Sequence, residues 1–482
     1  MSLKVFKNSA YYMAAALLPA AVNLFMLPVY SRYLSPSDYG IVALVLSLQS
    51  FLPIFLSLKI ESSLSRFYFE YKDEQLKVFV TTLFAVLTVV SLVTFAVILF
   101  SLNHIVKIVF PQTEHSYYVL FYLGALTAFF TVFKTAALYL IRVQQKARLA
   151  MSVSFAIFII GLAASIVEVI ILKRGGQGVV EATLITAGAA FFIYLFFIKE
   201  FFIWELDIKM LREPILFSLP IIPHTLSGII FMYSDRIILE KYVVLSAIGL
   251  YMFSDKIASV FKMIVNEFNN AFLPYYNQQA KKSVKFARSE SDKMSHIFVY
   301  AIVLMVVILG LFSVEIMSLF FDDRYFPVWK MMPLLASAYV FRSLYCFSSS
   351  ALFFEKKTGM VALITISSGI ANIVFNIVMI PKLGAMAAVM STILSFIMTY
   401  VLSELLTARM YKIKPNFGRN IIIILYMYTA LGVAIYINGN FGSFNVLDYS
   451  YKFLILLLGI AIGYKMQLLD FKKLGLLMRL KK

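Results

Sequence analysis

Fourteen apolar segments, each long enough to cross a lipid bilayer, follow one another along the 482-residue chain. A membrane-spanning helix needs about 20 apolar residues. Hydrophobic residues make up 61% of the chain and charged residues 14%, whereas about a quarter of a soluble domain is charged. The chain is therefore predicted to be an all-α polytopic membrane protein with about 14 transmembrane helices. The segments are 10–30, 39–60, 78–102, 116–141, 149–172, 180–198, 214–233, 243–264, 296–321, 330–354, 360–380, 384–406, 419–437 and 451–469.

Lysine and arginine are unevenly distributed between the two sides of the predicted bundle. With a cytoplasmic N-terminus, cytoplasmic segments hold 30, external loops hold ten, including Lys452, and the apolar segments hold three, which accounts for all 43. Cytoplasmic loops of membrane proteins carry such an excess. We therefore predict that both termini are cytoplasmic. The net charge of +18 then reflects membrane topology and does not indicate nucleic-acid binding.

Several other classes of protein are disfavoured by what the sequence lacks. Cys346 is the single cysteine, which rules out an intrachain disulfide, and the four histidines have no metal-ligand spacing. No phosphate-binding loop of the G-x-x-x-x-G-K-[ST] type is present. Asp322 and Asp323 form an acidic pair, as sugar transferases use, but they lie in a short external turn. The apolar run that begins near residue 10 continues too far for a signal peptide, so we interpret it as an uncleaved first span.

An internal repeat relates the two halves of the chain. Arg32 and Arg236 each follow the end of an apolar segment, next to a Tyr-Ser pair, and they are 204 residues apart. Gly40 and Gly249 open the next apolar segment in each half and are 209 residues apart. These arginines are predicted to be loop residues that correspond by symmetry.

A third landmark supports the same offset and defines the predicted domains. Gly178 and Gly384, each in a short turn before a helix rich in small residues, are 206 residues apart. The repeat contains six helices, so both copies have the same orientation in the membrane. We predict an N-terminal six-helix lobe (1–205), a C-terminal six-helix lobe (206–412), and two additional helices with a basic cytoplasmic tail (413–482).

Two cations occupy corresponding places inside apolar segments. Lys134 lies in TAFFTVFKTAALYL, and Arg342, in YVFRSLYCF, follows it by 208 residues. A charge near mid-bilayer is costly and usually faces an internal cavity. Two such cations form an anion site, and the forked donors of arginine suit phosphate. The alternative for Lys134 is that its ammonium reaches the cytoplasmic interface.

Further charged residues within the segments are candidates for a cavity or for energy coupling. Lys256 is a candidate third cavity cation, and its neighbour Asp255 a counter-charge or proton carrier; a structural ion pair is the alternative. Glu61 and Glu267 correspond under the repeat and, with Arg66, are placed near the cytoplasmic mouth; a solvated helix end is the alternative.

Two glutamates and a group of prolines complete the set. Glu168 and Glu315 lie towards the external ends of their segments, where a desolvated carboxyl could carry a coupling proton.

The first and seventh segments, which correspond under the repeat, contain prolines, and moving transporter helices tolerate such breaks. We predict that these two helices bend. The prolines are Pro19, Pro28, Pro220 and Pro223.

A family resemblance adds to this interpretation. LPVYSRYLSPSDYGIVAL (27–44), YSDRIILEKYVVLSAIGLY (233–251) and NIVFNIVMIPKLGAMAAVMSTILS (372–395) resemble the Wzx-type polysaccharide flippases of the multidrug/oligosaccharidyl-lipid/polysaccharide (MOP) exporter superfamily. The resemblance implies two six-helix lobes in a V that opens alternately to each side. It also implies cationic cavities, with Lys134, Arg342, Lys256 and Arg66 as the residues that fit. The last two helices resemble the extra pair of the lipid II flippase branch.

The function implied is translocation rather than catalysis. The expected substrate is an undecaprenyl-pyrophosphate-linked oligosaccharide, such as an O-antigen or capsule unit, moved from the cytoplasmic to the periplasmic leaflet of a bacterial inner membrane. No cofactor or metal is expected; coupling to protons, sodium or the membrane potential stays open. Expected partners are membrane lipids, a glycan polymerase and a chain-length regulator, and the default state is a monomer. The alternatives are a multidrug or cation antiporter of the same fold, a lipid II flippase, and a polytopic glycosyltransferase.

Overall fold

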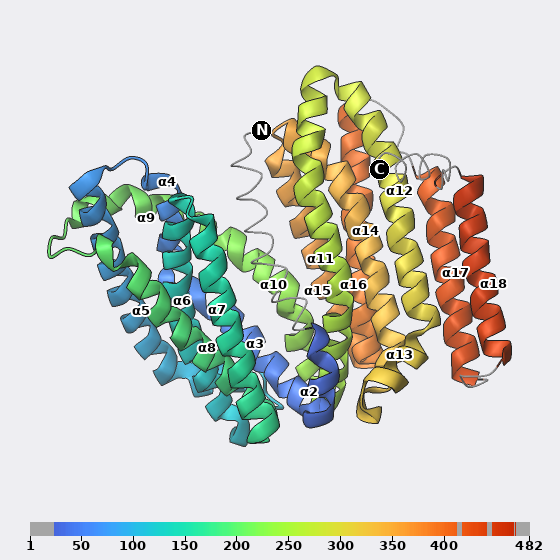
Figure 1. Cartoon of the computed structure of the whole chain (residues 1–482), viewed down its shortest axis with the longest axis horizontal. Coiled ribbons are helices and arrows are strands. Elements are labelled where there is room, and N and C mark those ends of the chain that lie inside the picture. The colour runs from blue at the N-terminus through green and yellow to red at the C-terminus, as the bar shows by residue number, and fades with distance from the viewer. Residues whose placement is uncertain (1–23, 412–416, 441–445, 467, 469–482) are drawn as a thin grey trace, which may run out of the picture. The chain divides into compact units, whose positions relative to one another are not determined.

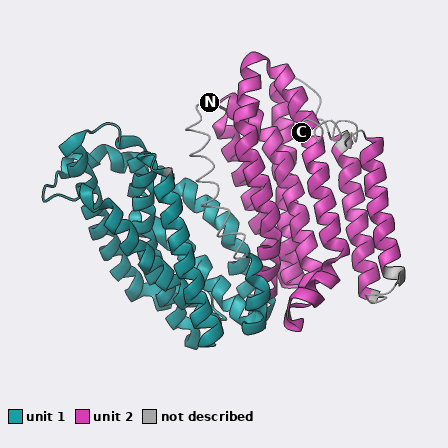
Figure 2. Ribbon diagram, viewed as in Figure 1, with its two compact units in different colours: residues 1–249 teal, residues 250–482 magenta. Residues whose placement is uncertain are grey.

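A computed structural model describes residues 24–411, 417–440, 446–466 and 468 of the chain (Figure 1). Within those residues the ordered structure is helical throughout. The chain divides into two compact units, residues 1–249 and 250–482 (Figure 2). These units are defined by contacts between residues, whereas the predicted lobe boundary at 205/206 is defined by the sequence repeat. That boundary therefore stays a prediction.

Unit 1 is organised around α3 (Pro36–Ser57), which packs against α5, α6, α8 and α10. Both faces of α3 carry buried residues, as expected of an apolar helix surrounded by others. The further α-helices of unit 1 are α2 (Leu27–Tyr33), α4 (Leu64–Phe67), α5 (Asp73–Val109), α6 (Tyr118–Val143), α7 (Ala147–Ser165), α8 (Gly175–Ile198), α9 (Arg212–Ser218) and α10 (Ile221–Glu240). Short 3₁₀ turns join several of them, and a π-helical segment, η3 (Ile166–Ile171), extends α7.

The start of α3 is fixed by its own sequence. Ser35 Oγ accepts a hydrogen bond from the Asp38 amide at 3.1 Å, and Asp38 Oδ2 accepts one from the Ser35 amide at 2.8 Å. This reciprocal pair is a capping box. The second oxygen of Asp38, Oδ1, accepts from the Gly176 amide at 2.8 Å, which ties the start of α3 to the start of α8.

Two glycines of the predicted repeat meet where α3 and α11 (Leu245–Lys282) begin, within unit 1. A Cβ atom at Gly249 would lie 1.7 Å from the Pro36 carbonyl oxygen, and one at Gly40 would lie 2.1 Å from the Leu245 carbonyl oxygen. Both distances are far inside van der Waals contact. The two landmarks are therefore glycines because two backbones cross there without room for a side chain.

Unit 2 has α14 (Val328–Phe354) at its centre, packed against α12, α15 and α16. Most of its residues are buried, including every position from Ser348 to Leu352. The further helices are the remainder of α11, α12 (Val284–Leu311), α13 (Ser313–Phe320), α15 (Thr358–Leu383), α16 (Ala385–Tyr411), α17 (Gly418–Asn440) and α18 (Val446–Lys465). The additional pair, α17 and α18, packs on α12.

The apolar segments correspond closely to these helices. Each segment from the second to the fourteenth overlaps a helix or a pair of consecutive helices; the first falls largely on residues 1–23, outside the described part. In the described residues nine helices are long and apolar enough to cross a membrane by length and composition, or ten with one bent pair. The chain is thus a multi-pass membrane protein, and the number of 14 spans stays a prediction.

The predicted bend in the seventh segment is confirmed. The segment consists of a 3₁₀ turn and α9 (208–218), followed by α10, and the two parts are bent by 44°. Pro220 is the residue immediately before α10, and Pro223 lies in its first turn. A proline lacks the amide hydrogen of the helical ladder, which accounts for the break. The corresponding bend in the first segment lies mostly outside the described residues.

Candidate functional site

Arg342 lies in the middle of α14, and not all of its N–H donors are used in hydrogen bonds within the described chain. Its Nη2 donates a hydrogen bond to Asn266 Oδ1 of α11 at 3.1 Å. The guanidinium carbon lies 5.8 Å from the centre of the Phe396 ring. The Nε atom is buried and has no hydrogen-bond partner in the described chain, and no described carboxylate lies within ion-pair distance. An arginine with a single neutral acceptor keeps several N–H groups for an anion.

Lys134 lies in α6, where one face carries buried residues such as Val132, Phe133 and Ala136. The lysine is half-buried, and among the described residues it forms neither an ion pair nor a hydrogen bond. A desolvated ammonium without a carboxylate is unfavourable in a membrane helix. Lys134 and Arg342 therefore share one property: each is a cation within a helix that no described carboxylate neutralises.

Another cation within a helix of unit 2, Lys452 of α18, is neutralised within the protein. Lys452 is 1% exposed and forms an ion pair with Glu315 of α13. The rings of Phe312 and Tyr449 lie 5.5 Å from its nitrogen. Lys452 was predicted to be an external loop residue, and this is wrong, because the helical residues of α18 begin at Val446. Glu315 is correspondingly the partner of a buried lysine, a pairing that no local pattern could reveal.

The predicted loop position of Arg32 and Arg236 is also wrong. Arg32 is an exposed residue of α2, and Arg236 is a buried residue of α10, 5% exposed. Arg236 Nη1 donates to Asp235 Oδ1 at 3.1 Å and to the Met232 carbonyl oxygen at 2.5 Å. The helix continues beyond Tyr-Ser-Asp-Arg because no proline or glycine interrupts it before Glu240. The symmetry relation between the arginines stays a prediction.

The two candidates from the end of the second segment differ in environment. Glu61, 3% exposed, lies in the 3₁₀ turn η1 (Ile60–Ser63) and pairs with Lys59 at 3.1 Å. Leu58 and Lys59 have positive φ values of 48° and 58°, so the chain turns sharply after α3. Arg66 is exposed and pairs with Glu70 at 2.6 Å, the arrangement of a solvated helix end. No sequence pattern points to Lys59 as a site residue.

Glu168 has the setting of a counter-charge. It lies in the π-helical segment η3, where the Leu172 amide bonds to the Val167 carbonyl oxygen. Its carboxylate lies 3.2 Å from Arg174 Nη1, which also donates to Glu181 Oε2 at 2.7 Å. The hydrogen bond to Glu181 raises the pKa of the Arg174 guanidinium, so this group stays charged.

The remaining candidates lie on α11 in unit 2. Asp255 is half-buried and its neighbour Lys256 is exposed. Glu267 is half-buried and follows Asn266, the residue that accepts the hydrogen bond from Arg342. Their roles in a cavity or in coupling stay predictions. In the described residues no group of three His, Cys, Asp or Glu side chains is placed to hold a metal.

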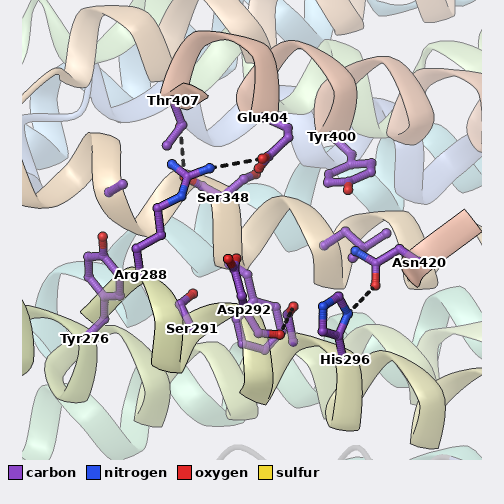
Figure 3. Close-up of a pocket in the computed structure, with 14 residues that line it drawn as sticks. Tyr276, Arg288, Ser291, Asp292, His296, Ser348, Tyr400, Glu404, Thr407 and Asn420 are labelled. Atoms are coloured by element: carbon purple, nitrogen blue, oxygen red, sulfur yellow. Dashed lines mark hydrogen bonds and ion pairs between the residues drawn. The ribbon is translucent and has the colours of Figure 1, made fainter. Parts of the chain in front are cut away.

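A small polar cavity lies elsewhere in unit 2, where one end of α12 meets α11, α14, α16 and α17 (Figure 3). Its free volume is about 30 Å³, room for one or two water molecules. No local sequence pattern predicts this cavity, because its lining is distributed over five helices. The lining residues are Tyr276, Arg288, Ser291, Asp292, Ser295, His296, Leu344, Phe347, Ser348, Ala351, Tyr400, Glu404, Thr407 and Asn420.

Polar contacts across this cavity join α12 to its neighbours. Arg288 Nη2 donates to Glu404 Oε1 of α16 at 3.1 Å, and His296 Nδ1 lies 2.9 Å from Asn420 Oδ1 of α17. Figure 3 shows both contacts, with Arg288 and His296 eight residues apart on the same helix. Thr407 Oγ1 donates to the Ser348 carbonyl oxygen at 3.1 Å and so links α16 to α14.

Comparison with known proteins places the chain in a family. Residues 5–280, more than half of the chain, match the family described as polysaccharide biosynthesis protein. The chain is 25% identical over 289 residues to an Lsg locus protein of Haemophilus influenzae, which covers 58% of this chain and 68% of that protein.

Solved structures show the same fold. Lipid II flippase MurJ, in an inward closed conformation, matches with a TM-score of 0.74 and 15% identity, over 94% of this chain and 99% of MurJ. An inward-facing multidrug resistance MATE family transporter of the MOP superfamily matches with a TM-score of 0.66 and 13% identity, over 86% and 96% of the two chains. These structures show the fold, and the family match shows the family: the chain belongs to the polysaccharide biosynthesis protein family and is folded like MurJ and the MATE transporter.

Proposed function

We propose that this protein is a flippase that moves an undecaprenyl-pyrophosphate-linked oligosaccharide from the cytoplasmic to the periplasmic leaflet of a bacterial inner membrane, with both termini in the cytoplasm. The observation that carries the proposal is the state of Arg342. Its guanidinium lies within an apolar helix, is bonded to one neutral amide oxygen, and has a buried Nε without a partner. Such donors suit a pyrophosphate, which accepts several hydrogen bonds and needs a positive charge.

Lys134 gives the other half of the chain a comparable charge. A pyrophosphate cannot enter hydrocarbon without compensation, because desolvating an anion is costly. One cation from each half would supply that compensation along the path, while the prenyl chain stays in lipid. The translocation itself requires no covalent chemistry. Energy coupling by protons, sodium or the membrane potential, and a partnership with a glycan polymerase and a chain-length regulator, are further parts of this proposal.

The charge of these positions also separates the alternatives. A drug or cation antiporter would be served better by carboxylates in the path than by Lys134 and Arg342. The lipid II flippase alternative shares the pyrophosphate, so the same cations suit it, and the glycan distinguishes the two. The family match to polysaccharide biosynthesis favours the oligosaccharide.

A complementation experiment tests the proposal. A strain without the gene and without a second flippase is complemented with wild type or with Lys134→Ala/Arg342→Ala, and surface polysaccharide and the sidedness of the lipid-linked intermediate are measured. We expect wild type to restore surface glycan, and the double variant to be present at normal level with the intermediate retained on the cytoplasmic side. Arg66→Ala is the matched control, because that arginine is exposed and already paired with Glu70.

Two outcomes would contradict the proposal. If the deletion leaves surface polysaccharide and the intermediate unchanged, the substrate class is wrong. If the deletion abolishes the glycan but the double variant restores it fully, the substrate stands and the two cations do not bind it.

A further inference from the structure

We propose that three asparagines of α11, Asn266, Asn270 and Asn277, bind the sugar residues of the lipid-linked glycan, while Arg342 binds its pyrophosphate. The three side chains form a strip along one face of the helix, which we call the amide strip. The inference rests on the proposed function for the presence of a glycan. It adds the residues that contact the sugars and the chemistry by which they recognise them.

The three asparagines lie on the same side of α11. An α-helix turns by about 100° per residue, so positions 266, 270 and 277 fall within an arc of about 40°. From Asn266 to Asn277 the strip extends about 16 Å along the helix axis. Its residues are half-buried or exposed, whereas the buried Phe272 and Tyr276 of the same helix belong to the apolar core. The amide strip is therefore a separate, polar face of α11.

The amide strip lies at the depth of a membrane-spanning helix. At one end Asn266 Oδ1 accepts the hydrogen bond from Arg342 Nη2 at 3.1 Å. Towards the other end the rings of Tyr276 and Phe354 lie 6.5 Å apart. This part of α11 therefore runs beside α14 from its middle to its last residue. That half of α14 belongs to the apolar segment 330–354, so the strip is polar where its neighbour is apolar.

Hydrogen-bonding groups along the strip have no partner in the described chain. Asn277 Oδ1 is buried and has none. Asn266 uses Oδ1 for Arg342, and no described contact involves its Nδ2. The exposed Asn270 side chain forms no hydrogen bond among the described residues. Pro274 lies inside α11, and because proline has no amide hydrogen, the Asn270 carbonyl oxygen also lacks its helical donor.

These groups together suit a ligand rich in hydroxyls. A side-chain amide both donates and accepts hydrogen bonds without carrying charge, and each hydroxyl of a sugar does the same. Unpaired polar groups are costly where they face hydrocarbon, so a strip at this depth is expected to line the path of a polar headgroup.

The order of groups along α11 matches the order in a lipid-linked glycan. Arg342, at the Asn266 end of the strip, supplies the positive charge and forked donors that a pyrophosphate needs. Asn270 and Asn277 follow with neutral amides, as the sugars follow the pyrophosphate. A site built to bond hydroxyls rejects a ligand that lacks them, because its own polar groups then stay unpaired. We therefore expect binding to depend on the sugars as well as on the pyrophosphate.

Backbone hydrogen exchange of the purified full-length protein tests the inference without any variant. Lipid-linked glycan extracted from the strain without the gene is compared with undecaprenyl pyrophosphate that carries no sugar, at equal occupancy. The glycan-bearing lipid should slow exchange of residues 266–278 about tenfold more than the bare lipid does. Residues 340–344, around Arg342, should respond equally to both lipids.

A pair of substitutions then tests the side chains. Asn270→Leu/Asn277→Leu removes two amides, so affinity for the glycan-bearing lipid should fall about 10- to 100-fold. Affinity for bare undecaprenyl pyrophosphate should stay within about twofold of wild type. Asn270→Gln/Asn277→Gln keeps the amides and should retain part of the affinity. The control is Gln278→Leu, which removes an exposed amide of the same helix about 100° away from Asn277 and should bind both lipids like wild type.

The outcomes separate this inference from the proposed function. If both lipids slow exchange of 266–278 equally, or the leucine variant keeps its affinity for the glycan-bearing lipid, the strip does not bind sugars and the proposed function stands. If the leucine variant loses both lipids to the same extent, the asparagines act on the fold and the inference is likewise refuted. If wild type binds neither lipid, the proposed function fails and this inference fails with it.

Discussion

Arg342 and Lys452 are both cations within apolar helices of unit 2, yet their surroundings are opposite. Lys452 is buried, lies near aromatic rings such as that of Phe312, and is paired with Glu315. Arg342 is half-buried, bonded to one amide oxygen, and has a nitrogen without a partner in the described chain. A neutralised cation stabilises the fold in which it is buried. A cation that is not neutralised costs stability, and a binding partner outside the chain is the simplest reason to keep it.

The largest expected effect comes from breaking the neutralised pair. Lys452→Ala leaves the Glu315 carboxylate buried without compensation, which should cost about 3–5 kcal/mol in the free energy of unfolding. The double variant Glu315→Met/Lys452→Met should lose much less, because no charge remains buried. Denaturant unfolding in mixed micelles measures both. A double variant as unstable as the single one would show that the pair contributes more than mutual neutralisation.

The opposite result is expected at Arg342. Arg342→Ala removes one hydrogen bond of the folded protein, so the free energy of unfolding should change by about 1 kcal/mol or less. Flipping should fall about 10- to 100-fold, the loss expected for a charge-assisted hydrogen bond to phosphate. Arg342→Lys should retain part of the rate, because it keeps the charge and loses the fork. Fluorescence-based sidedness of the lipid-linked substrate in vesicles provides the rate; an unchanged rate in Arg342→Ala would remove this residue from the substrate path.

Lys134 should show a gain in stability together with a loss of transport. Replacing it by Met removes a desolvated ammonium that has no described partner, and we expect a stabilisation of about 1–2 kcal/mol. Flipping should fall about tenfold if the ammonium meets the pyrophosphate. Thermal unfolding and flipping are measured on the same preparation. A destabilised Lys134→Met protein would indicate that the lysine reaches the interface and is solvated there.

The smallest effect is expected for the exposed pair of Arg66 and Glu70. Its N–O distance is 2.6 Å, but the Arg66 side chain is 61% exposed. Pairs of this kind contribute about 0.2–1 kcal/mol, because water and salt screen them. A double-mutant cycle on stability, repeated at high salt, measures the coupling. A coupling that is larger and does not respond to salt would show that this helix end is less solvated than its exposure indicates.

The comparison also shows which parts of the site could be predicted. The position of Arg342 and Lys134 inside apolar segments is visible in the sequence, and so is the charge each one contributes. The state of pairing is not visible, because Lys452 and Glu315 are 137 residues apart and Arg288 and Glu404 are 116 apart. Arg236 is a different case, because the absence of proline and glycine before Glu240, which lets α10 continue past it, is visible in the sequence.

The glycine landmarks occupy an intermediate position. Their spacing predicts the repeat, whereas the reason for glycine at Gly40 and Gly249 is the crossing of the starts of α3 and α11. From the sequence, either glycine could equally be explained by a turn at the start of its helix. The close approach of two backbones is a property of packing that leaves no local pattern in either segment.

The sequence by itself determined the membrane class, the positions of the apolar helices, the bend at Pro220 and the family. These features depend on composition and on the spacing of residues that are close together in the sequence. The tertiary structure decided which charges are neutralised and where a polar cavity forms. Those properties depend on distances of a few ångströms between side chains on different helices, and electrostatic energy varies steeply with such distances and with burial.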